Sequence, residues 1–115
     1  MKAVEKCKSV RALFAKQERW VKGYWHAWRV DGYLYSEKPD FSAVPCFCLQ
    51  GALNQVYGED TLANEQAQQR IIKAIKKLGL RKRLNGEWTD EIIAFNDSRR
   101  TKWEHIKAVI HAARV

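Results

Sequence analysis

Long hydrophobic runs are missing from this chain of 115 residues. No stretch approaches the length of a membrane span, and Lys2, Glu5, Lys6 and Lys8 interrupt the apolar residues near the start, where a secretion signal would need an apolar core. Low-complexity segments and linker-like stretches are missing as well. We therefore expect a cytoplasmic protein that does not enter the membrane.

The chain contains only three cysteines, an odd number. An odd count does not suit a disulfide framework and is typical of free thiols in a reducing compartment. Structural zinc usually requires paired Cys or His ligands at short spacing, whereas here Cys46 and Cys48 have only the distant Cys7. His105 and His111 are six positions apart, too far for a tight chelating pair on one helix. We expect no metal and no cofactor.

What the chain does have is enough apolar sequence for one core. Its composition is 46% hydrophobic and 11% aromatic, more than a disordered chain carries. A chain of this length forms one domain by default, so we expect residues 1–115 to fold as a single domain. The net charge of +8 favours a polyanionic partner, either nucleic acid or an acidic protein.

The first half of the chain predicts a helix followed by a β-hairpin. Apolar residues at helical spacing predict an amphipathic helix from residue 2 to about 18. From Trp20 onward apolar and polar residues alternate, which indicates a strand ending near Val30. Asp31-Gly32 suits a two-residue turn, after which residues 33–35 can return antiparallel.

The second half predicts helices. Ser42 as a cap and Pro45 in the first turn predict a helix that continues to Tyr57, in which Gly51 permits close approach of a neighbour. Further helices are expected from Asp60-Thr61 to Gly79, over residues 91–95 with Thr89 or Asp90 as cap, and from a capping box of Thr101 and Glu104 onward. The fold class is α+β and mostly helical, with about four to five helices packed against one small antiparallel β-hairpin.

Several motifs in this order resemble a family of small uncharacterised bacterial and phage proteins, best known from actinobacteria and their phages. The similarity spans roughly Arg11 to Ala113, and no activity or cofactor comes with it. The dense cationic segment departs from the family pattern, whose members are often less basic. The matching elements are Trp20-Val21-Lys22-Gly23, Asp31-Gly32, Cys46-Phe47-Cys48-Leu49-Gln50-Gly51-Ala52-Leu53, Ile93-Ala94-Phe95-Asn96-Asp97 and Arg100-Thr101.

Two motifs have both a chemical and a structural interpretation. Cys46 or Cys48 at a helix start, where the helix dipole lowers a thiol pKa, could act as a nucleophile with His26, His105 or His111 as base. The simpler interpretation is that Cys48 is a small buried hydrophobic residue and Cys46 an edge residue. Asn96-Asp97 could orient such a base, but short polar side chains more often hold a turn by bonding to nearby backbone.

The candidate binding surface is cationic. Six positive residues fall within eleven positions around the end of a predicted helix, a second cluster surrounds the Asn-Asp motif, and hairpin aromatics could add stacking contacts. The clusters join only if the fold brings them together. The predicted contacts are Lys73, Lys76, Lys77, Arg81, Lys82 and Arg83, then Arg99, Arg100 and Lys102, then Trp25, Tyr33 and Tyr35.

These patterns predict a non-enzymatic binding protein, of phage or mobile-element origin, that engages nucleic acid or a nucleic-acid-handling protein. One alternative is a protein inhibitor or adaptor whose charges recognise an acidic host protein. Another is a cysteine-dependent enzyme, which an exposed thiol with a histidine in hydrogen-bond reach would favour. An aromatic patch without a continuous cationic track would favour the protein partner.

Overall fold

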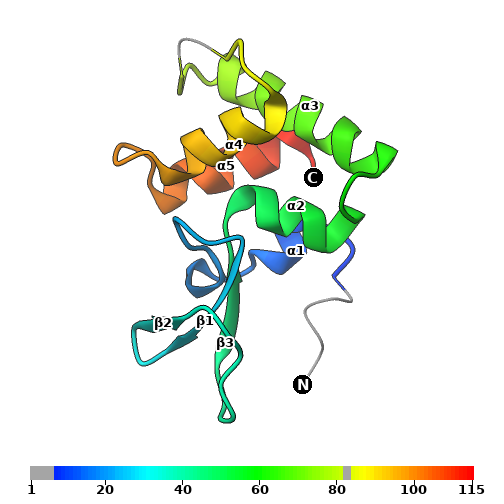
Figure 1. The fold of residues 1–115 in the computed structure, drawn as a ribbon. Helices are drawn as coiled ribbons and strands as arrows, with labels where there is room; N and C mark the ends of the chain where they lie inside the picture. Colours follow the sequence, from blue (N-terminus) through cyan, green and yellow to red (C-terminus); the bar gives the residue numbers. More distant parts are fainter. Residues whose placement is uncertain (1–6, 82–83) are drawn as a thin grey trace.

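The computed structural model describes residues 7–81 and 84–115 and consists of a helical layer above a small antiparallel sheet (Figure 1). Four helices of nine or more residues form the layer, and the sheet lies at its lower end. The elements are α1 (Val10–Leu13), the 3-10 helix η2 (Gln17–Arg19), β1 (His26–Val30), β2 (Tyr33–Tyr35), β3 (Val44–Phe47), α2 (Leu49–Tyr57), α3 (Leu62–Lys77), α4 (Trp88–Asp97) and α5 (Trp103–Ala113). The predicted α+β class is confirmed.

The N-terminal helix is much shorter than predicted. Part of the predicted range lies outside the described residues, and Cys7 to Ser9 are not helical. The Ser9 hydroxyl accepts the Ala12 amide at 3.0 Å, which starts α1, and the helix ends within about one turn. The Val10 amide donates to the Val115 carbonyl at 2.7 Å. This long-range bond fixes the start of α1 at the C-terminus of the chain, which local periodicity does not reveal.

The predicted hairpin is confirmed. Strands β1 and β2 pair antiparallel, with Trp28 opposite Tyr35 and Val30 opposite Tyr33. Asp31 and Gly32 have φ angles of 49° and 85°, the left-handed values that a two-residue hairpin turn needs at both positions.

A third strand, β3, occupies the place where the sequence predicted the first helical turn. Val44–Phe47 pairs antiparallel with the other side of β1, so the strand order is β2-β1-β3. Pro45 is tolerated because β3 is an edge strand. The predicted Ser42 cap is wrong: Cys48 is the N-cap of α2, and its Sγ accepts the Gly51 amide at 3.3 Å. Pairing with β1 therefore outweighs the local helix signal.

The following helices begin and end largely as predicted, with two corrections. Thr61 caps α3 by accepting the Asn64 amide at 3.1 Å. Helix α4 begins at Trp88, earlier than the predicted Glu91. Glu87 occupies the N-cap position, so the predicted caps Thr89 and Asp90 lie inside the helix. The predicted capping box of α5 is also wrong. Lys102 is the N-cap, and its amide donates to Nδ1 of His105 at 2.9 Å.

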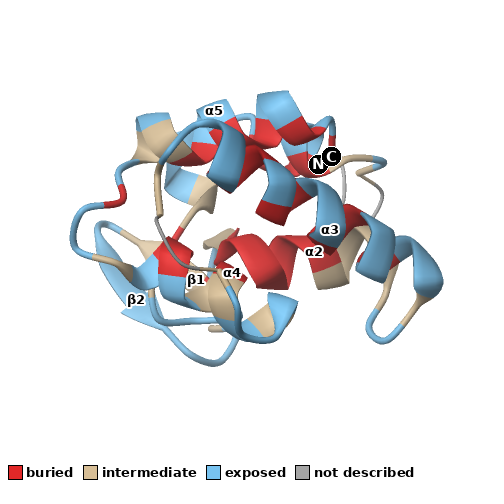
Figure 2. Ribbon diagram, turned by 90° about the horizontal axis from the view of Figure 1, so that it is seen from above, coloured by how far each residue is buried: buried red, intermediate tan, exposed pale blue. Residues whose placement is uncertain are grey.

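The core lies between the helices. Buried residues colour the inward faces of α2, α3 and α5 in Figure 2, while the outward faces are exposed. Leu53 and Ile75 are fully buried and Ile110 is 3% exposed, as the sequence predicted. From the sheet, Phe47 of β3 joins this core, whereas Ala27 and Cys46 form a separate small cluster with Val21.

Gly51 allows the loop before β1 to reach α2. A Cβ at this position would overlap the backbone carbonyl of Trp25. The predicted close approach is thus confirmed, with a loop as the neighbour. It holds Trp25 over α2, at the edge of the polar pocket described below.

Candidate binding surfaces

The predicted lysines of α3 are exposed, but they do not all point to the same surface. Lys73 and Lys77 line a groove of about 350 Å³ between α3 and the end of α5. Lys76 is exposed and is not among its lining residues. The sequence analysis missed two further cations of this groove, Arg70 and Arg114. Lys82 and Arg83 lie outside the described residues.

A second hollow brings the two predicted cationic clusters together. It measures about 750 Å³ and lies between the end of α3, the end of α4 and the start of α5. Arg81 of the first cluster and Arg100 of the second both line it, together with His105. Arg99 and Lys102 are exposed but are not lining residues. Arg81 also lies 3.8 Å from the Glu91 carboxylate, a partly exposed pair that contributes little to stability.

The groove and the hollow lie on the same side of the α3–α5 pair. On α3, Arg70, Lys73 and Lys77 are spaced at three, four and seven positions, which places them on one helix face. On α5, His105 of the hollow and Ala112 of the groove are seven positions apart and share a face for the same reason. We call this surface the cationic face; its residues are Arg70, Lys73, Lys77, Arg81, Arg100 and Arg114.

The aromatic residues singled out in the sequence are exposed but lie elsewhere. Trp25, Tyr33 and Tyr35 expose 51%, 73% and 40% of their surface, and Phe41, which the sequence analysis missed, exposes 53%. The rings of Tyr35 and Phe41 meet edge to face at 5.9 Å. In Figure 1 the sheet lies at the opposite end of the molecule from α3 and α5. The hairpin residues Tyr33 and Tyr35 and the cationic face therefore belong to separate surfaces, whereas Trp25 lies beside α2 and α3.

A polar pocket between α2 and α3 was not predicted. It measures about 470 Å³, and most of the side chains around it carry an amide, hydroxyl or carboxylate group. Its lining residues are Trp25, Gln50, Asn54, Glu59, Asp60, Thr61, Asn64, Glu65, Gln68 and Thr89. One sequence signal could have revealed it: Gln50 and Asn54 are four positions apart, as are Asn64 and Gln68, so each pair shares a helix face.

Hydrogen bonds fix the orientation of the amides in this pocket. Asn64 Nδ2 donates to the Gly58 carbonyl at 2.8 Å and to Asn54 Oδ1 at 2.9 Å. Gln50 Nε2 donates to Asn54 Oδ1 at 3.0 Å and lies 3.4 Å from Asn64 Oδ1. Because a backbone carbonyl can only accept, it determines which end of each amide faces which neighbour. Gln50 is 1% exposed, and its Oε1 has no hydrogen-bond partner among residues 7–81 and 84–115.

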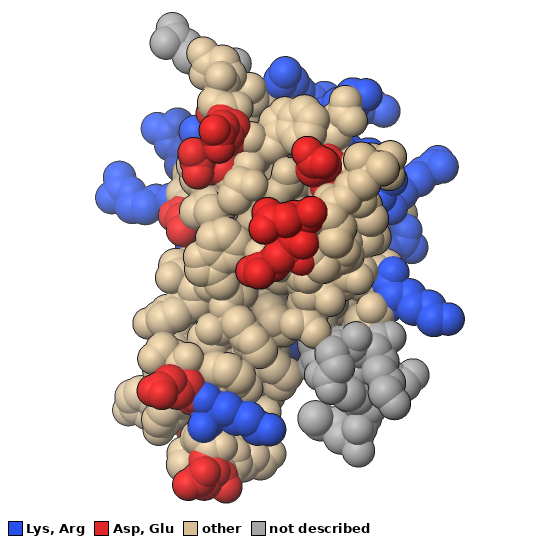
Figure 3. Space-filling view, turned by 45° about the vertical axis from the view of Figure 1, so that its right-hand side comes forward, with Lys and Arg blue, Asp and Glu red and all other residues tan. Residues whose placement is uncertain are grey.

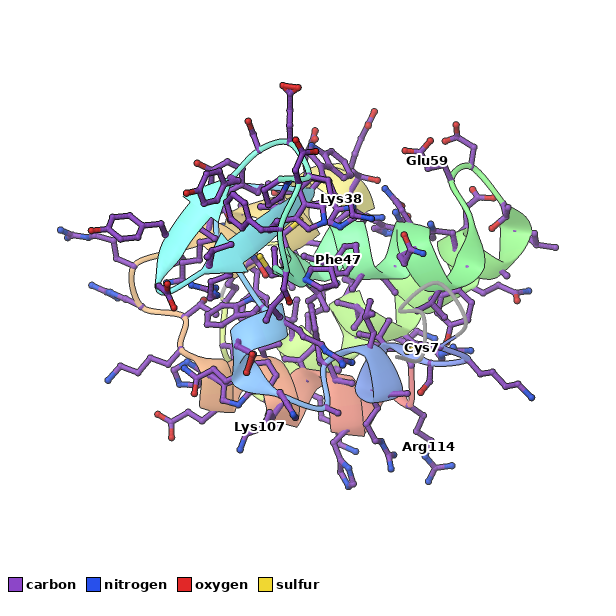
Figure 4. The ribbon with its side chains drawn as sticks, turned by 90° about the horizontal axis from the view of Figure 1, so that it is seen from below. Cys7, Lys38, Phe47, Glu59, Lys107 and Arg114 are labelled. Carbon is purple, nitrogen blue, oxygen red and sulfur yellow. The ribbon has the colours of Figure 1, made fainter. Side chains whose placement is uncertain are left out.

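Carboxylates surround the mouth of the polar pocket. Glu59, Asp60 and Glu65 are exposed lining residues near the α2–α3 turn. Figure 3 brings the side of the molecule with this turn forward and shows acidic side chains at the centre of the face, with Lys and Arg at its margins. In Figure 4, Glu59 lies on the opposite side of the molecule from Lys107 and Arg114. The acidic mouth of this pocket and the cationic face are thus separate surfaces.

A family model described as a family of unknown function, DUF6197, matches residues 3–115. The chain belongs to the DUF6197 family. No curated protein and no solved structure matches it. Among the residues that the structure describes in this DUF6197 protein, no helix is long and apolar enough to cross a membrane, and no three His, Cys, Asp or Glu side chains are grouped so that they could hold a metal ion.

The Asn-Asp motif of the DUF6197 protein joins distant segments rather than holding only a local turn. Asn96 is fully buried, and its Oδ1 accepts from Trp20 Nε1 at 2.6 Å and from the Leu49 amide at 2.9 Å. Its Nδ2 donates to the Val21 carbonyl at 3.1 Å. Asp97 accepts the Gly23 amide at 2.9 Å. The role is structural, but the predicted bonding to nearby backbone at a local turn is wrong, because these partners lie on the loop before β1 and at the start of α2.

The two central cysteines of the DUF6197 protein are enclosed. Cys46 lies in β3, fully buried, so its assignment as an edge residue of a helix start was wrong; Cys48 is 4% exposed. Burial raises the pKa of both thiols, opposite to the lowering expected from a helix dipole. Cys46 Sγ donates to the Ala27 carbonyl at 3.4 Å, and Cys48 Sγ accepts the Gly51 amide. Protonated, enclosed thiols give the nucleophile hypothesis no geometric support.

The histidines considered as bases are engaged elsewhere. The His26 ring stacks on Phe47 and lies against Trp28, with centroid distances of 4.3 Å to each, and partial burial lowers the pKa of His26. His105 accepts the Lys102 amide at the start of α5. His111 is exposed on α5, where it lines a shallow groove with Arg11.

Proposed function

We propose that this DUF6197 protein is a small non-enzymatic binding protein that engages nucleic acid through its cationic face. The observation that supports this function is that Arg81 and Arg100, from two separate cationic segments, line one hollow on the same side of α3 and α5 as the groove of Lys73 and Lys77. Charges required only for solubility need not gather on one side of two helices. A concave row of cations suits a phosphate backbone.

The dimensions of the cationic face suit several phosphates. Arg70 and Lys77 are about 10 Å apart along the axis of α3, at about 1.5 Å per residue. Duplex DNA carries roughly one charge per 1.7 Å of its axis, so this length spans more phosphate charges than its three cations can neutralise. The whole face can neutralise at most about six phosphates, one for each of its Lys and Arg residues. Contacts to phosphates position a nucleic acid without reading its bases. We therefore expect binding with little sequence preference.

The test is titration of labelled duplex and single-stranded oligonucleotides at about 50 mM and about 150 mM salt. Release of about six counterions predicts a logarithmic salt slope near −5 for duplex DNA. A triple variant, Lys73→Glu with Lys77→Glu and Arg100→Glu, should lose most of its affinity. The matched control reverses Lys16, Lys38 and Lys107, which are exposed cations outside this face.

The control separates local recognition from overall charge because both variants change the net charge equally. If both variants lose affinity to the same extent, binding depends on the overall charge of the protein and not on the cationic face. If neither oligonucleotide binds at low salt, the nucleic-acid function is wrong.

A protein partner is the second candidate, and exposed aromatic residues favour it. Tyr33 and Phe41 expose 73% and 53% of their surface, and β2 is an edge strand. Such residues are enriched where proteins meet. A complex with a host protein that survives the triple reversal of the cationic face but not Tyr33→Ser would support this adaptor or inhibitor function. Phage origin and cytoplasmic location stay predictions.

A further inference from the structure

The polar pocket between α2 and α3 contains a buried acceptor that needs a donor. Gln50 Oε1 has no partner among the described residues, and its side chain is 1% exposed. A buried acceptor without a hydrogen bond costs about 1–3 kcal/mol relative to a satisfied one. Rotating the amide would not remove the need, because Gln50 Nε2 already faces the oxygens of Asn54 and Asn64. The pocket is therefore prepared for a group that donates hydrogen bonds.

The charge around this pocket is opposite to that of the whole chain. The chain carries +8, yet the charged residues described in the lining are the acids Glu59, Asp60 and Glu65. Exposed carboxylates at a mouth attract a cation and accept its hydrogen bonds. The buried acceptor selects a hydrogen-bond donor, and the acidic mouth selects a cation. Together they select a cation that donates hydrogen bonds.

Trp25 adds a flat surface beside the carboxylates. Its side chain lines the pocket and is 51% exposed, because the contact of its carbonyl with Gly51 holds the loop against α2. A delocalised planar cation stacks on an indole ring better than a compact ammonium does. Several N–H donors in a rigid plane can also reach an amide oxygen and a carboxylate at once.

We propose that the pocket between α2 and α3 binds a guanidinium group, with one N–H donated to Gln50 Oε1 and others to the carboxylates of Glu59 or Glu65. The group can come from an arginine side chain of another protein or from a small guanidino compound; the recognising chemistry is the same. The cavity of about 470 Å³ is large enough for either. This site is independent of the cationic face, so either proposal can fail alone.

The test uses the full chain, labelled with ¹⁵N, and titrates it with methylguanidinium chloride against equal concentrations of sodium chloride. We expect saturable shifts of the side-chain amide signals of Gln50, Asn54 and Asn64. Methylammonium should bind at least about three-fold more weakly, because its compact ammonium group does not stack on an indole ring and does not present several N–H donors in one plane. The peptide acetyl-Gly-Arg-Gly-amide distinguishes the sources: tighter binding than methylguanidinium indicates a protein ligand, and weaker binding a free small molecule.

A matched pair of variants makes the proposal falsifiable. Glu59→Gln with Glu65→Gln keeps the shape of two exposed side chains and should weaken methylguanidinium binding by about five-fold or more. Glu37→Gln with Glu104→Gln removes two exposed carboxylates elsewhere and should leave binding unchanged. Equal weakening in both pairs, or shifts that sodium chloride reproduces, would show that the pocket does not recognise the guanidinium group and would overturn the proposal.

Discussion

Asn96 shows how one side chain can hold three segments of this protein together. Its amide accepts from Trp20 and Leu49 and donates to Val21, partners that are 47 to 76 residues away in sequence. The loop before β1, the start of α2 and the end of α4 therefore meet at a single buried group. Removing it would leave buried donors and acceptors without partners rather than merely deleting a contact.

We expect Asn96→Ala to lower the free energy of unfolding by about 3 kcal/mol or more, because each abandoned buried group costs about 1–3 kcal/mol. Urea unfolding followed by circular dichroism measures this loss. Ser98→Ala is the control, since Ser98 Oγ accepts only the exposed Arg100 amide at 3.3 Å, and it should cost less than about 1 kcal/mol. Similar losses for both would contradict the joining role of Asn96.

Thiol reactivity tests the assignment of the cysteines as packing residues. Burial raises the pKa of Cys46 and Cys48 above that of an ordinary thiol, so the folded protein keeps both protonated where the unfolded chain ionises. The contribution of the raised thiol pKa to the free energy of unfolding is fully present below an ordinary thiol pKa of about 8.5. It is lost as the pH rises above that value. Alkylation by iodoacetamide near neutral pH should label half-buried Cys7 first. Rapid labelling of Cys48 in the native state would revive the nucleophile hypothesis.

Sequence could predict residue types at these sites but not their surroundings. The cationic clusters and the aromatic residues Trp25, Tyr33 and Tyr35 were singled out, whereas Asn96 was predicted to hold only a local turn and Phe41 was missed. That Arg81 and Arg100 line the same hollow depends on how α3 packs beside α5. That Gln50 Oε1 lacks a partner among the described residues depends on hydrogen bonds between amides of two helices. Such arrangements arise from long-range packing, which periodicity in one segment does not encode.

At the scale of elements, Gly51 reverses the usual preference of helices. In an open helix interior, Gly→Ala stabilises by up to about 1 kcal/mol. Here the new methyl group would overlap the Trp25 carbonyl, so the loop before β1 must move away from α2. We expect Gly51→Ala to destabilise the protein, measured as a fall in Tm, and to shift the Trp25 indole signal. An increase in Tm would show that the loop does not press on α2.

Strand β3 marks the limit of local prediction at this scale. Ser42 and Pro45 are good helix-start residues, and Val44 and Phe47 are too short a signal to predict a strand. What decides the outcome is the free side of β1, where Ala27 pairs with Cys46 and Arg29 with Val44. The hairpin, in contrast, was predictable because Asp31-Gly32 specifies its turn locally. Helix α3 was predictable because its cap, its apolar stripe and its terminal glycine agree.

For the whole molecule, charge is distributed by face rather than evenly. The cationic face lies along α3 and α5, whereas the acidic mouth of the polar pocket lies at the α2–α3 turn. Helix α3 contributes residues to both surfaces. It also contributes to the core, because Ile71 and Ile75 are fully buried. One helix thus separates three roles by its faces, and mutations on it should separate those roles too.

The last prediction uses that separation. Ile75→Ala removes a fully buried side chain from the core and should lower the free energy of unfolding by about 2–5 kcal/mol. Lys73→Glu with Lys77→Glu changes exposed residues, and the lost interaction with the C-terminal dipole of α3 should cost no more than about 1 kcal/mol. Urea unfolding measures both. In oligonucleotide titrations at low temperature, the Ile75 variant that remains folded should bind like the wild type, while the double lysine variant should bind weakly. If the lysine variant instead loses stability as severely as Ile75→Ala, these charges are structural, and weakened binding by that variant would not locate a nucleic-acid site.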